Sequence, residues 1–318
     1  MTAASEAQPA QRKREKRNVD GWLVLDKPVG MTSTHAVSVV KRTFAAKKAG
    51  HAGTLDPLAT GVLPIALGEA TKTVPFVMDG RKSYRFTVRW GVETDTDDAE
   101  GQTIATSDAR PEVAAIQAAL SRFTGTVMQT PPKFSAVKIA GERAYDLARE
   151  GEAVSLEPRP VEIDSLGLVG VVDADHAEFA AECGKGTYVR ALARDLGRAL
   201  GTCGHVSALR RTAVGPFTEQ DAASLDDLGQ LTQGTVDGVA GAAPPLLPVA
   251  AGLANLPALA VSRADASRLA RGQAVLLRGR DAPVMEGWIA VSVHGQLIAL
   301  AEVEQGELRP RRIFNLSP

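Results

Sequence analysis

The sequence has few of the features that mark secreted, membrane-spanning or metal-binding proteins. Its 318 residues include only two cysteines and five histidines, and aromatic residues make up 4% of the chain. Cys183 and Cys203 do not form a CxxC pair, so neither a disulfide framework nor a zinc site is expected, and both are predicted to be free thiols in a reducing compartment. The histidines are scattered and form no HExxH motif, which favours a mechanism without a metal.

Long apolar runs and nucleotide-binding loops are also missing. The most apolar stretch, 236–261, is interrupted by four prolines and is typical of a linker rather than a membrane span. The motif GKGT at 184–187 lacks the spacing of a P-loop, and no GxGxxG opens a helix after a strand. These absences argue against nucleotide hydrolysis and dinucleotide redox chemistry.

Charge and length limit the possibilities less strongly. The 36 basic and 37 acidic residues nearly cancel, so the position of the charges has to decide whether a polyanionic partner fits. No apolar segment follows the basic run at 12–17, and we expect 1–19 to be a disordered tail of a cytoplasmic protein, with a loose RNA-contacting arm as the alternative. The length predicts two domains, placed at 20–245 and 246–318.

The spacing of apolar residues predicts a mixture of strands and helices. Strands are expected at 21–27, 61–68 and 83–90, and in 163–172 and 176–183, and helices at 33–44, 111–123 and 187–200. Pro75 is expected to end or kink a helix that begins near Gly68. The acidic stretch 91–101 lacks the ligand spacing of an EF-hand and is predicted to be a solvated surface loop. From about Leu256 onward, short apolar runs between turns predict a small, mostly β module.

One carboxylate stands out from its surroundings. Asp56 lies in HAGTLDPLATG, between Leu55 and Pro57, in a stretch otherwise suited to turning the backbone and burying apolar groups. An aspartate before a proline most often forms a turn. However, Gly53 and Gly61 allow another part of the chain to approach closely, and the prolines stiffen the backbone, as the preorganisation of a nucleophile requires. Both interpretations stay open on these residues alone.

Five ordered motifs resemble those of the TruB-type tRNA pseudouridine synthases. They are GWLVLDKPVGMTS, HAGTLDPLATGVLPIALGEATK, KSYRFTVRWGVETDTDDAEG, GTYVRALARDLG and HVSALRRTAVGPF, which together cover most of 21–217. The C-terminal module, ending in AEVEQGELRPRRIFN, is similar to the PUA-like RNA-binding domain of bacterial members. The resemblance implies an α+β fold, with a mixed, largely antiparallel central sheet, peripheral helices and a small β-rich PUA-like domain.

The resemblance also implies an activity, the isomerisation of uridine 55 in the T-loop of tRNA. The N1–C1′ bond of a flipped-out nucleotide is cut, the uracil turns, and C5 is joined to C1′. Asp56 would be the catalytic carboxylate, which either attacks C1′ or abstracts a ribose proton. No cofactor or metal is implied, because nothing is oxidised and no group leaves the enzyme. The implied partner is the tRNA T-arm, without DNA, a membrane or a protein partner, and a monomer is expected.

Six further residues match substrate-binding positions of the family. Tyr84 would stack on the target uracil, and its hydroxyl is a candidate for handling the C5 proton. Arg190 resembles the arginine that pairs with the catalytic aspartate and orients it. Tyr188 would be a second pocket aromatic, and Leu209 would be an apolar wall residue. His51 would fill the space left by the flipped nucleotide, and Lys27 would support the pocket. Without the resemblance, each would be interpreted as an ordinary core, turn or surface residue.

Dispersed basic residues are expected to contact RNA phosphates, so that affinity falls with added salt. They are Lys41, Arg42, Lys47, Lys48, Arg210, Arg211, Arg309, Arg311 and Arg312. Two other functions remain as alternatives. The first is an RNA-binding or tRNA-folding protein that keeps the scaffold without catalysis, and the second is a hydrolytic nucleosidase or glycosidase, which would need a water-positioning acid near Asp56.

Overall fold

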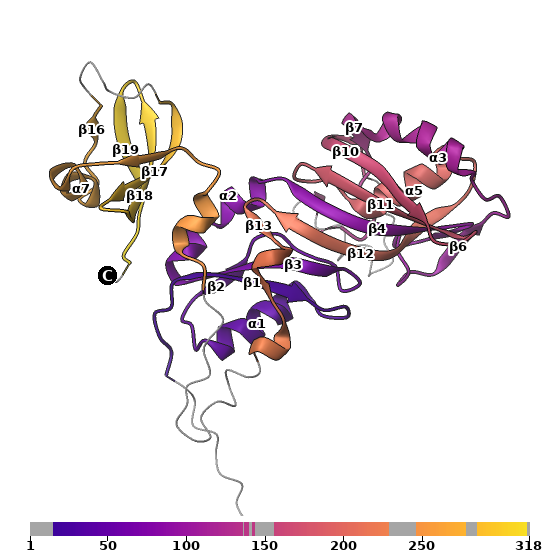
Figure 1. Cartoon of the computed structure of the whole chain (residues 1–318), viewed down its shortest axis with the longest axis horizontal. Helices are drawn as coiled ribbons and strands as arrows, with labels where there is room; N and C mark the ends of the chain where they lie inside the picture. Colours follow the sequence, from indigo (N-terminus) through magenta and orange to yellow (C-terminus); the bar gives the residue numbers. More distant parts are fainter. Residues whose placement is uncertain are drawn as a thin grey trace, which may run out of the picture.

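The computed structural model describes residues 15–135, 137–139, 142–143, 156–228, 246–277 and 285–316. The described chain forms a large ten-stranded sheet and a separate five-stranded sheet near the C-terminus (Figure 1). Residues 1–14 of the predicted tail and 236–245 of the predicted linker lie outside the described residues. The predicted α+β fold class is confirmed.

The large sheet is mixed and largely antiparallel, as expected. Only the β1–β14 and β3–β12 pairings are parallel among its described strands. In spatial order its strands are β14 (Ala222–Ala223), β1 (Gly21–Lys27), β3 (Thr60–Leu67), β12 (Gly204–Val214), β4 (Lys82–Trp90), β11 (His176–Cys183), β10 (Arg159–Val171) and β7 (Gly125–Gln129), with β13 (Phe217–Thr218) beside β12 and β2 (Ala49–His51) beside β3.

Strand β4 shows why the sheet buries one face. Its alternating residues Phe86, Val88 and Trp90 are buried, and the Phe86 ring stacks on Phe179 of β11 with 5.5 Å between centroids. Burying aromatic and β-branched side chains on one side of a strand stabilises the sheet against the helices that cover it. The strand predicted at 83–90 is therefore confirmed.

Helices cover the apolar face of the large sheet. Val40, Ile116 and Leu192, on three different helices, belong to one core cluster with Phe86 and its neighbours. The helical segments of this domain are α1 (Ser33–Thr43), η1 (Gly68–Lys72), α2 (Val74–Asp79), α3 (Val113–Leu120), η2 (Ser121–Phe123), α5 (Val189–Ala199) and η3 (Glu219–Asp221). Two small hairpins complete it, β5 (Val92–Thr94) with β6 (Thr103–Thr106) and β8 (Lys138–Ile139) with β9 (Glu142–Arg143).

Two helix starts illustrate the local rules. The Thr32 hydroxyl accepts a hydrogen bond from the His35 backbone N–H and so caps the start of α1, the helix expected at 33–44. The prediction that Pro75 ends or kinks a helix is wrong. A short 3₁₀ helix ends at Lys72, and Pro75 lies in the first turn of α2, where its missing N–H leaves no intrahelical bond unmade.

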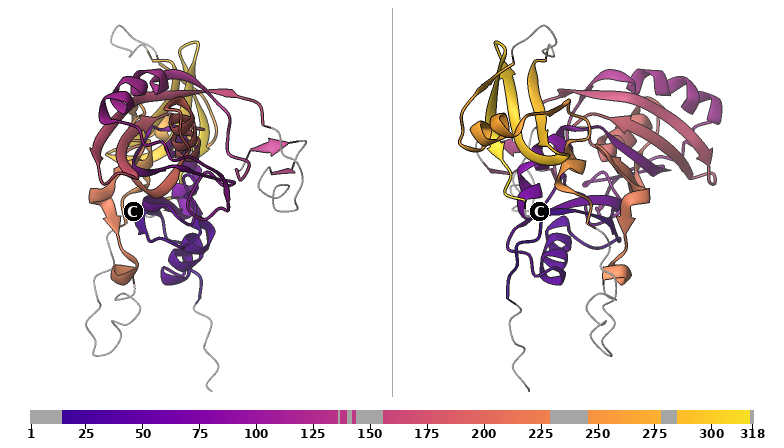
Figure 2. Two further views of the ribbon diagram at one scale, coloured as in Figure 1. Left: turned by 90° about the vertical axis from the view of Figure 1, so that its right-hand side faces the viewer. Right: turned by 60° about the vertical axis from the view of Figure 1, so that its left-hand side comes forward.

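The C-terminal sheet stands to one side of the large sheet (Figure 2). Its strand order is β15 (Ala258–Ala260), β17 (Gly287–Val293), β18 (Gln296–Glu304), β19 (Glu307–Ile313) and β16 (Val275–Leu276), with α7 (Arg263–Ala270) packed against it and η4 (Val249–Leu253) leading into it. This β-rich unit agrees with the module expected after about Leu256.

The two sheets share a core. Trp22 of β1 is completely buried in one apolar cluster with Leu253, Leu300 and Phe314 of the C-terminal part. Lys72 of η1 also donates a hydrogen bond of 2.7 Å to the Ile313 carbonyl. The relative placement of the sheets is thus stabilised by both apolar packing and polar contacts.

Gly61 supplies a sharp test of how closely β3 and β12 approach. It has φ +97°, and a Cβ added there would lie 2.2 Å from the Arg211 carbonyl oxygen. We expect Gly61→Ala to lower the free energy of unfolding by about 3 kcal/mol, because both a strained φ and a backbone clash result. Gly125→Ala is the control, since Gly125 has φ +88° and open space around it. Equal losses in urea unfolding would show that strain alone matters.

Candidate active site

The loop between β2 and β3 carries Asp56, and buried side chains hold its backbone. The Ser33 hydroxyl accepts a hydrogen bond of 2.8 Å from the Leu55 N–H and donates one of 3.0 Å to the Leu55 carbonyl. The ammonium of the fully buried Lys27 donates to the Pro57 carbonyl at 3.4 Å and to the Pro28 and Met31 carbonyls of the turn between β1 and α1. Burial lowers the pKa of Lys27 to about 8, although Asp56 opposes the shift.

A second buried cation holds the other end of this loop. The Arg211 guanidinium donates to the Gly53 carbonyl at 3.1 Å, to the Thr54 carbonyl at 3.2 Å and to the Val62 carbonyl at 2.9 Å. The expectation that Arg211 contacts RNA phosphates is therefore wrong. Successive side chains of β12 point to opposite faces of the sheet, and Arg211 points to the buried face. The loop backbone is thus fixed on both sides of Asp56.

The Asp56 carboxylate faces solvent and is held by Arg190 at the start of α5. Their ion pair measures 3.0 Å, and 39% of the Asp56 side chain is exposed, against 7% of Arg190. Arg190 also donates to the backbone carbonyls of Thr96 and Phe134, both at 2.9 Å, and lies 3.4 Å from the Asp98 carboxylate. The arginine therefore orients a carboxylate that stays open to a ligand.

The prediction of a solvated loop at 91–101 is wrong for three of its carboxylates, because Glu93, Asp97 and Asp98 are buried, while Glu100 is exposed. These three carboxylates pair with arginines spaced four residues apart along α5, a spacing that puts them on one helix face. The pairs are Arg190 with Asp98, Arg194 with Asp97 and Arg198 with Glu93. Burial raises the pKa of Asp97 to about 6 in spite of its arginine partner. The RxxxRxxxR spacing was the sequence signal that could have revealed these partners.

Two of the family-matched residues pack in the apolar surroundings of the loop. Leu209 belongs to the core cluster that contains Leu55, and the half-buried Tyr84 packs against that cluster. Tyr188 caps the start of α5, and its backbone N–H and carbonyl exchange hydrogen bonds of 2.8 and 3.2 Å with the buried Gln129 amide. Burial raises the pKa of Tyr84, and Arg211 opposes that shift.

His51 lies on β2, where its backbone pairs with Ile65 of β3. Its Nδ1 atom is buried and has no hydrogen-bond partner in the described part of the chain. Burial, followed by the charge of Arg211, lowers the pKa of His51, so the imidazole is neutral near pH 7. A ligand that supplies a donor or acceptor would satisfy this atom.

The basic residues expected to contact RNA differ in whether their side chains already have a partner within the protein. Arg210 pairs with Asp26 and Glu219, and Arg309 and Arg311 pair with glutamates of the C-terminal sheet, while Arg312 donates to a neighbouring backbone carbonyl. By contrast, Arg42, Lys47 and Lys48 are exposed and form no ion pair with any described residue. These three residues, from the last turn of α1 to the segment just before β2, are called the basic ridge below.

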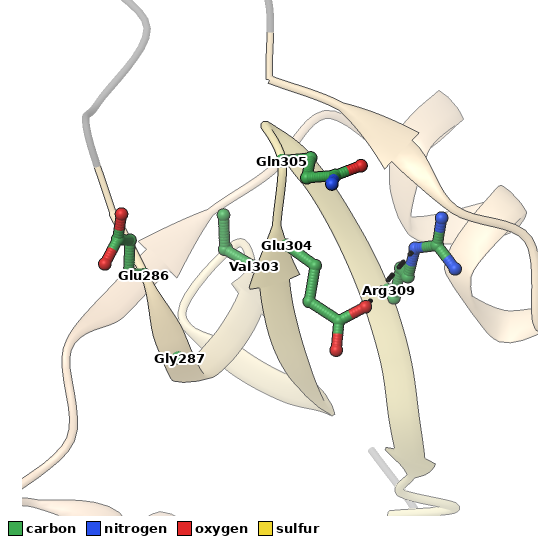
Figure 3. Close-up of a pocket in the computed structure, with 6 residues that line it drawn as sticks. All are labelled: Glu286, Gly287, Val303, Glu304, Gln305 and Arg309. Carbon is green, nitrogen blue, oxygen red and sulfur yellow. Dashed lines mark ion pairs between the residues drawn. The ribbon is translucent and has the colours of Figure 1, made fainter.

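A separate hollow, which none of the residues discussed above lines except Arg309, lies in the C-terminal sheet (Figure 3). It is lined by Glu286, Gly287, Val303, Glu304, Gln305 and Arg309. Its Glu304 and Arg309 side chains lie 3.9 Å apart, and each has a closer partner at 2.7 Å, Arg311 for Glu304 and Glu307 for Arg309. The described residues contain no group of three His, Cys, Asp or Glu side chains that could hold a metal, and none of their helices combines the length and apolarity needed to cross a bilayer.

Comparison with solved structures shows the fold. A chain of the archaeal box H/ACA sRNP Nop10-Cbf5 complex matches with a TM-score of 0.70 and 23% identity, over 92% of this chain and 85% of that one. A chain of an H/ACA RNP bound to a substrate RNA containing 2′-deoxyuridine matches with a TM-score of 0.72 and 23% identity, over 92% and 84%. At this identity the shared property is the fold.

Comparison by sequence reaches further. Residues 41–189 match the family model for the N-terminal domain of TruB family pseudouridylate synthases, and 190–243 match that for the C-terminal domain of tRNA pseudouridylate synthase B. A tRNA pseudouridine synthase B of Bradyrhizobium diazoefficiens is 65% identical over 96% of this chain and 89% of its own length. The Agrobacterium fabrum protein of the same name is 54% identical over 95% and 97%. The chain therefore belongs to the TruB family of pseudouridylate synthases.

Proposed function

We propose that this protein isomerises uridine 55 in the T-loop of tRNA to pseudouridine, with Asp56 as the catalytic carboxylate. The names of its relatives support tRNA as the substrate. The observation that carries the proposal is the asymmetry of the Asp56–Arg190 pair, in which the arginine is buried and the carboxylate is open. An oriented carboxylate in a fixed loop is what nucleophilic or proton-abstracting chemistry at a sugar requires.

The reaction needs little besides this carboxylate and a closed apolar pocket. The N1–C1′ bond breaks and the C5–C1′ bond forms, while C5 loses its hydrogen and N1 gains a proton. Asp56 either attacks C1′ or removes a ribose proton, and the geometry accommodates both. The apolar cluster around Leu55 and Leu209 would retain the released uracil and keep water away from C1′.

The remaining family-matched residues take supporting roles in this proposal. Tyr84 would form the floor under the uracil and handle the C5 proton, and Tyr188 and Leu209 would form the walls. His51, with its unpaired buried nitrogen, would occupy the space behind the flipped nucleotide. Lys27 supports the pocket through its hydrogen bond to the Pro57 carbonyl.

Binding of tRNA would use the basic ridge, since none of its side chains forms an ion pair with a described residue. The ridge directly precedes β2, the strand that ends at His51. It therefore supplies phosphate contacts close to where the flipped base would enter. The C-terminal sheet, similar to the PUA-like module, is proposed to position the RNA.

A hydrolytic glycosidase fits the site less well. Such an enzyme pairs its nucleophile with a second carboxyl group that activates water. The carboxylate that shares Arg190 with Asp56 is that of Asp98, whose side chain is 4% exposed and accepts hydrogen bonds from the Thr96 hydroxyl and the Glu100 N–H. It is closed off from water, and free uracil among the products would contradict the isomerase.

Asp56→Asn tests the proposed chemistry. With T-loop tRNA tritiated at uridine C5, wild-type protein should release tritium, and the variant should release it more than about 10³-fold more slowly. The free energy of unfolding should change by less than about 1 kcal/mol, because Arg190 keeps Asp98 and two backbone carbonyls as partners.

Asp79→Asn is the matched control, since Asp79 is an exposed aspartate paired with Lys185. This variant should release tritium at the wild-type rate. Near-normal release by Asp56→Asn would remove this residue from the mechanism. If neither wild type nor variant released tritium while tRNA bound tightly, the protein would be an RNA-binding or tRNA-folding protein without this activity.

The double replacement Lys47→Gln with Lys48→Gln tests the basic ridge. We expect tRNA affinity to fall by about 10-fold. The slope of log affinity against log salt should become shallower by about 1.5, because fewer counterions are released on binding when two phosphate contacts are lost. Filter binding at several salt concentrations measures both. Lys185→Gln is the control because its ammonium is paired with Asp79 at 2.9 Å, and an equal effect there would assign the change to net charge alone.

A further inference from the structure

Arg211 is a buried cation that the proposed mechanism does not use. It is 2% exposed, and no carboxylate of the described residues lies within ion-pair distance of its guanidinium. Burying an unpaired charge is costly unless its hydrogen bonds are satisfied, and a neutral residue of similar size would avoid that cost. The position of this charge therefore calls for a reason beyond folding.

The partners of Arg211 come from both sides of the site. Its Nη1 and Nη2 atoms donate to the Thr54 and Gly53 carbonyls, immediately before Leu55 and Asp56. On its other side, Arg211 is paired in register with Tyr84 across β12 and β4, so the two side chains lie next to each other on one face of the sheet. The charge of Arg211 opposes the rise that burial causes in the pKa of Tyr84. One planar group thus lies between the catalytic loop, which it holds by hydrogen bonds, and the residue proposed as the pocket floor.

We propose that Arg211 is a positioning residue that fixes the Tyr84 hydroxyl relative to the Asp56 loop, so that removal of the C5 proton depends on it. The inference rests on the proposed function and deepens it. Cutting of the N1–C1′ bond involves Asp56 at the sugar, whereas loss of the C5 hydrogen takes place on the base, above Tyr84. A rigid connection between loop and floor keeps both reacting centres in place during the turn of the uracil.

The geometry explains why an arginine is used here. A guanidinium presents five N–H donors in a fixed plane. Here it bonds the Gly53, Thr54 and Val62 carbonyls and lies beside Tyr84 in the sheet, with further N–H donors left over. A lysine keeps the positive charge but has three donors on one atom and cannot span these partners. Arg211→Lys therefore separates the effect of position from the effect of charge.

A double-mutant cycle in the rate of tritium release tests the proposal. Wild type, Arg211→Lys, Tyr84→Phe and the double variant are compared in single turnover with T-loop tRNA tritiated at uridine C5. We expect Arg211→Lys to slow release by about 10- to 100-fold without changing tRNA affinity. In the Tyr84→Phe background, the same replacement should have no further effect, because the group through which it acts is gone.

Arg85→Lys is the matched control and should release tritium at the wild-type rate, since Arg85 follows Tyr84 on β4 but is exposed and paired with Glu178. Rate effects that multiply in the double variant, or a Tyr84→Phe variant as fast as wild type, would overturn the proposal. Arg211→Gln, which keeps a planar donor group, replaces Arg211→Lys if the latter does not fold. Failure of both to fold would assign Arg211 to stability alone and equally overturn it.

The outcome is separable from that of the proposed function. If wild-type protein releases no tritium, the isomerase itself is wrong and the cycle has no rate to compare. If wild type releases tritium and Asp56→Asn does not, the isomerase holds, and only the pattern among the Arg211 and Tyr84 variants decides the role of Arg211.

Discussion

The contact between Arg190 and Asp56 is the interaction on which the rest of the site depends. Arg190 starts a helix, Asp56 sits in a loop 134 positions earlier in the chain, and Asp98 lies in a hairpin between them. A buried guanidinium requires compensating charge and acceptors, and these three segments supply them. Since Asp98 balances the arginine from the protein side, the Asp56 carboxylate is free to face solvent without leaving its partner unpaired.

Local patterns were enough to predict most of the sheet. The alternation of Phe86, Val88 and Trp90 identified β4, and the apolar run 176–183 coincides with β11. Such signals lie within a few neighbouring residues. The burial of Glu93 and Asp97 could not be found in this way, because a carboxylate is buried only when a cation reaches it, and here the cations lie on α5, about a hundred residues later.

The candidate site shows the same division. The motif match placed Asp56 and Arg190 together, and the structure brings them into contact, while the roles of Tyr84, His51 and their neighbours stay predictions. Two adjacent arginines looked equivalent in sequence, yet they point to opposite faces of β12, so that Arg210 meets Asp26 and Arg211 is buried. A count of basic residues does not reveal which ones remain available to a phosphate.

The burial of Trp22 in an apolar cluster shared by the two sheets couples their stabilities. The indole of this β1 residue packs against Gly252 so closely that a Cβ there would lie 2.6 Å from Nε1, and Leu300 and Phe314 complete the enclosure. Removing the C-terminal sheet would expose a large aromatic surface of the other domain to water. A chimaera with the C-terminal module of a relative would accordingly need to preserve the residues that enclose Trp22 as well as the strand boundaries. The two modules would therefore have to be exchanged together.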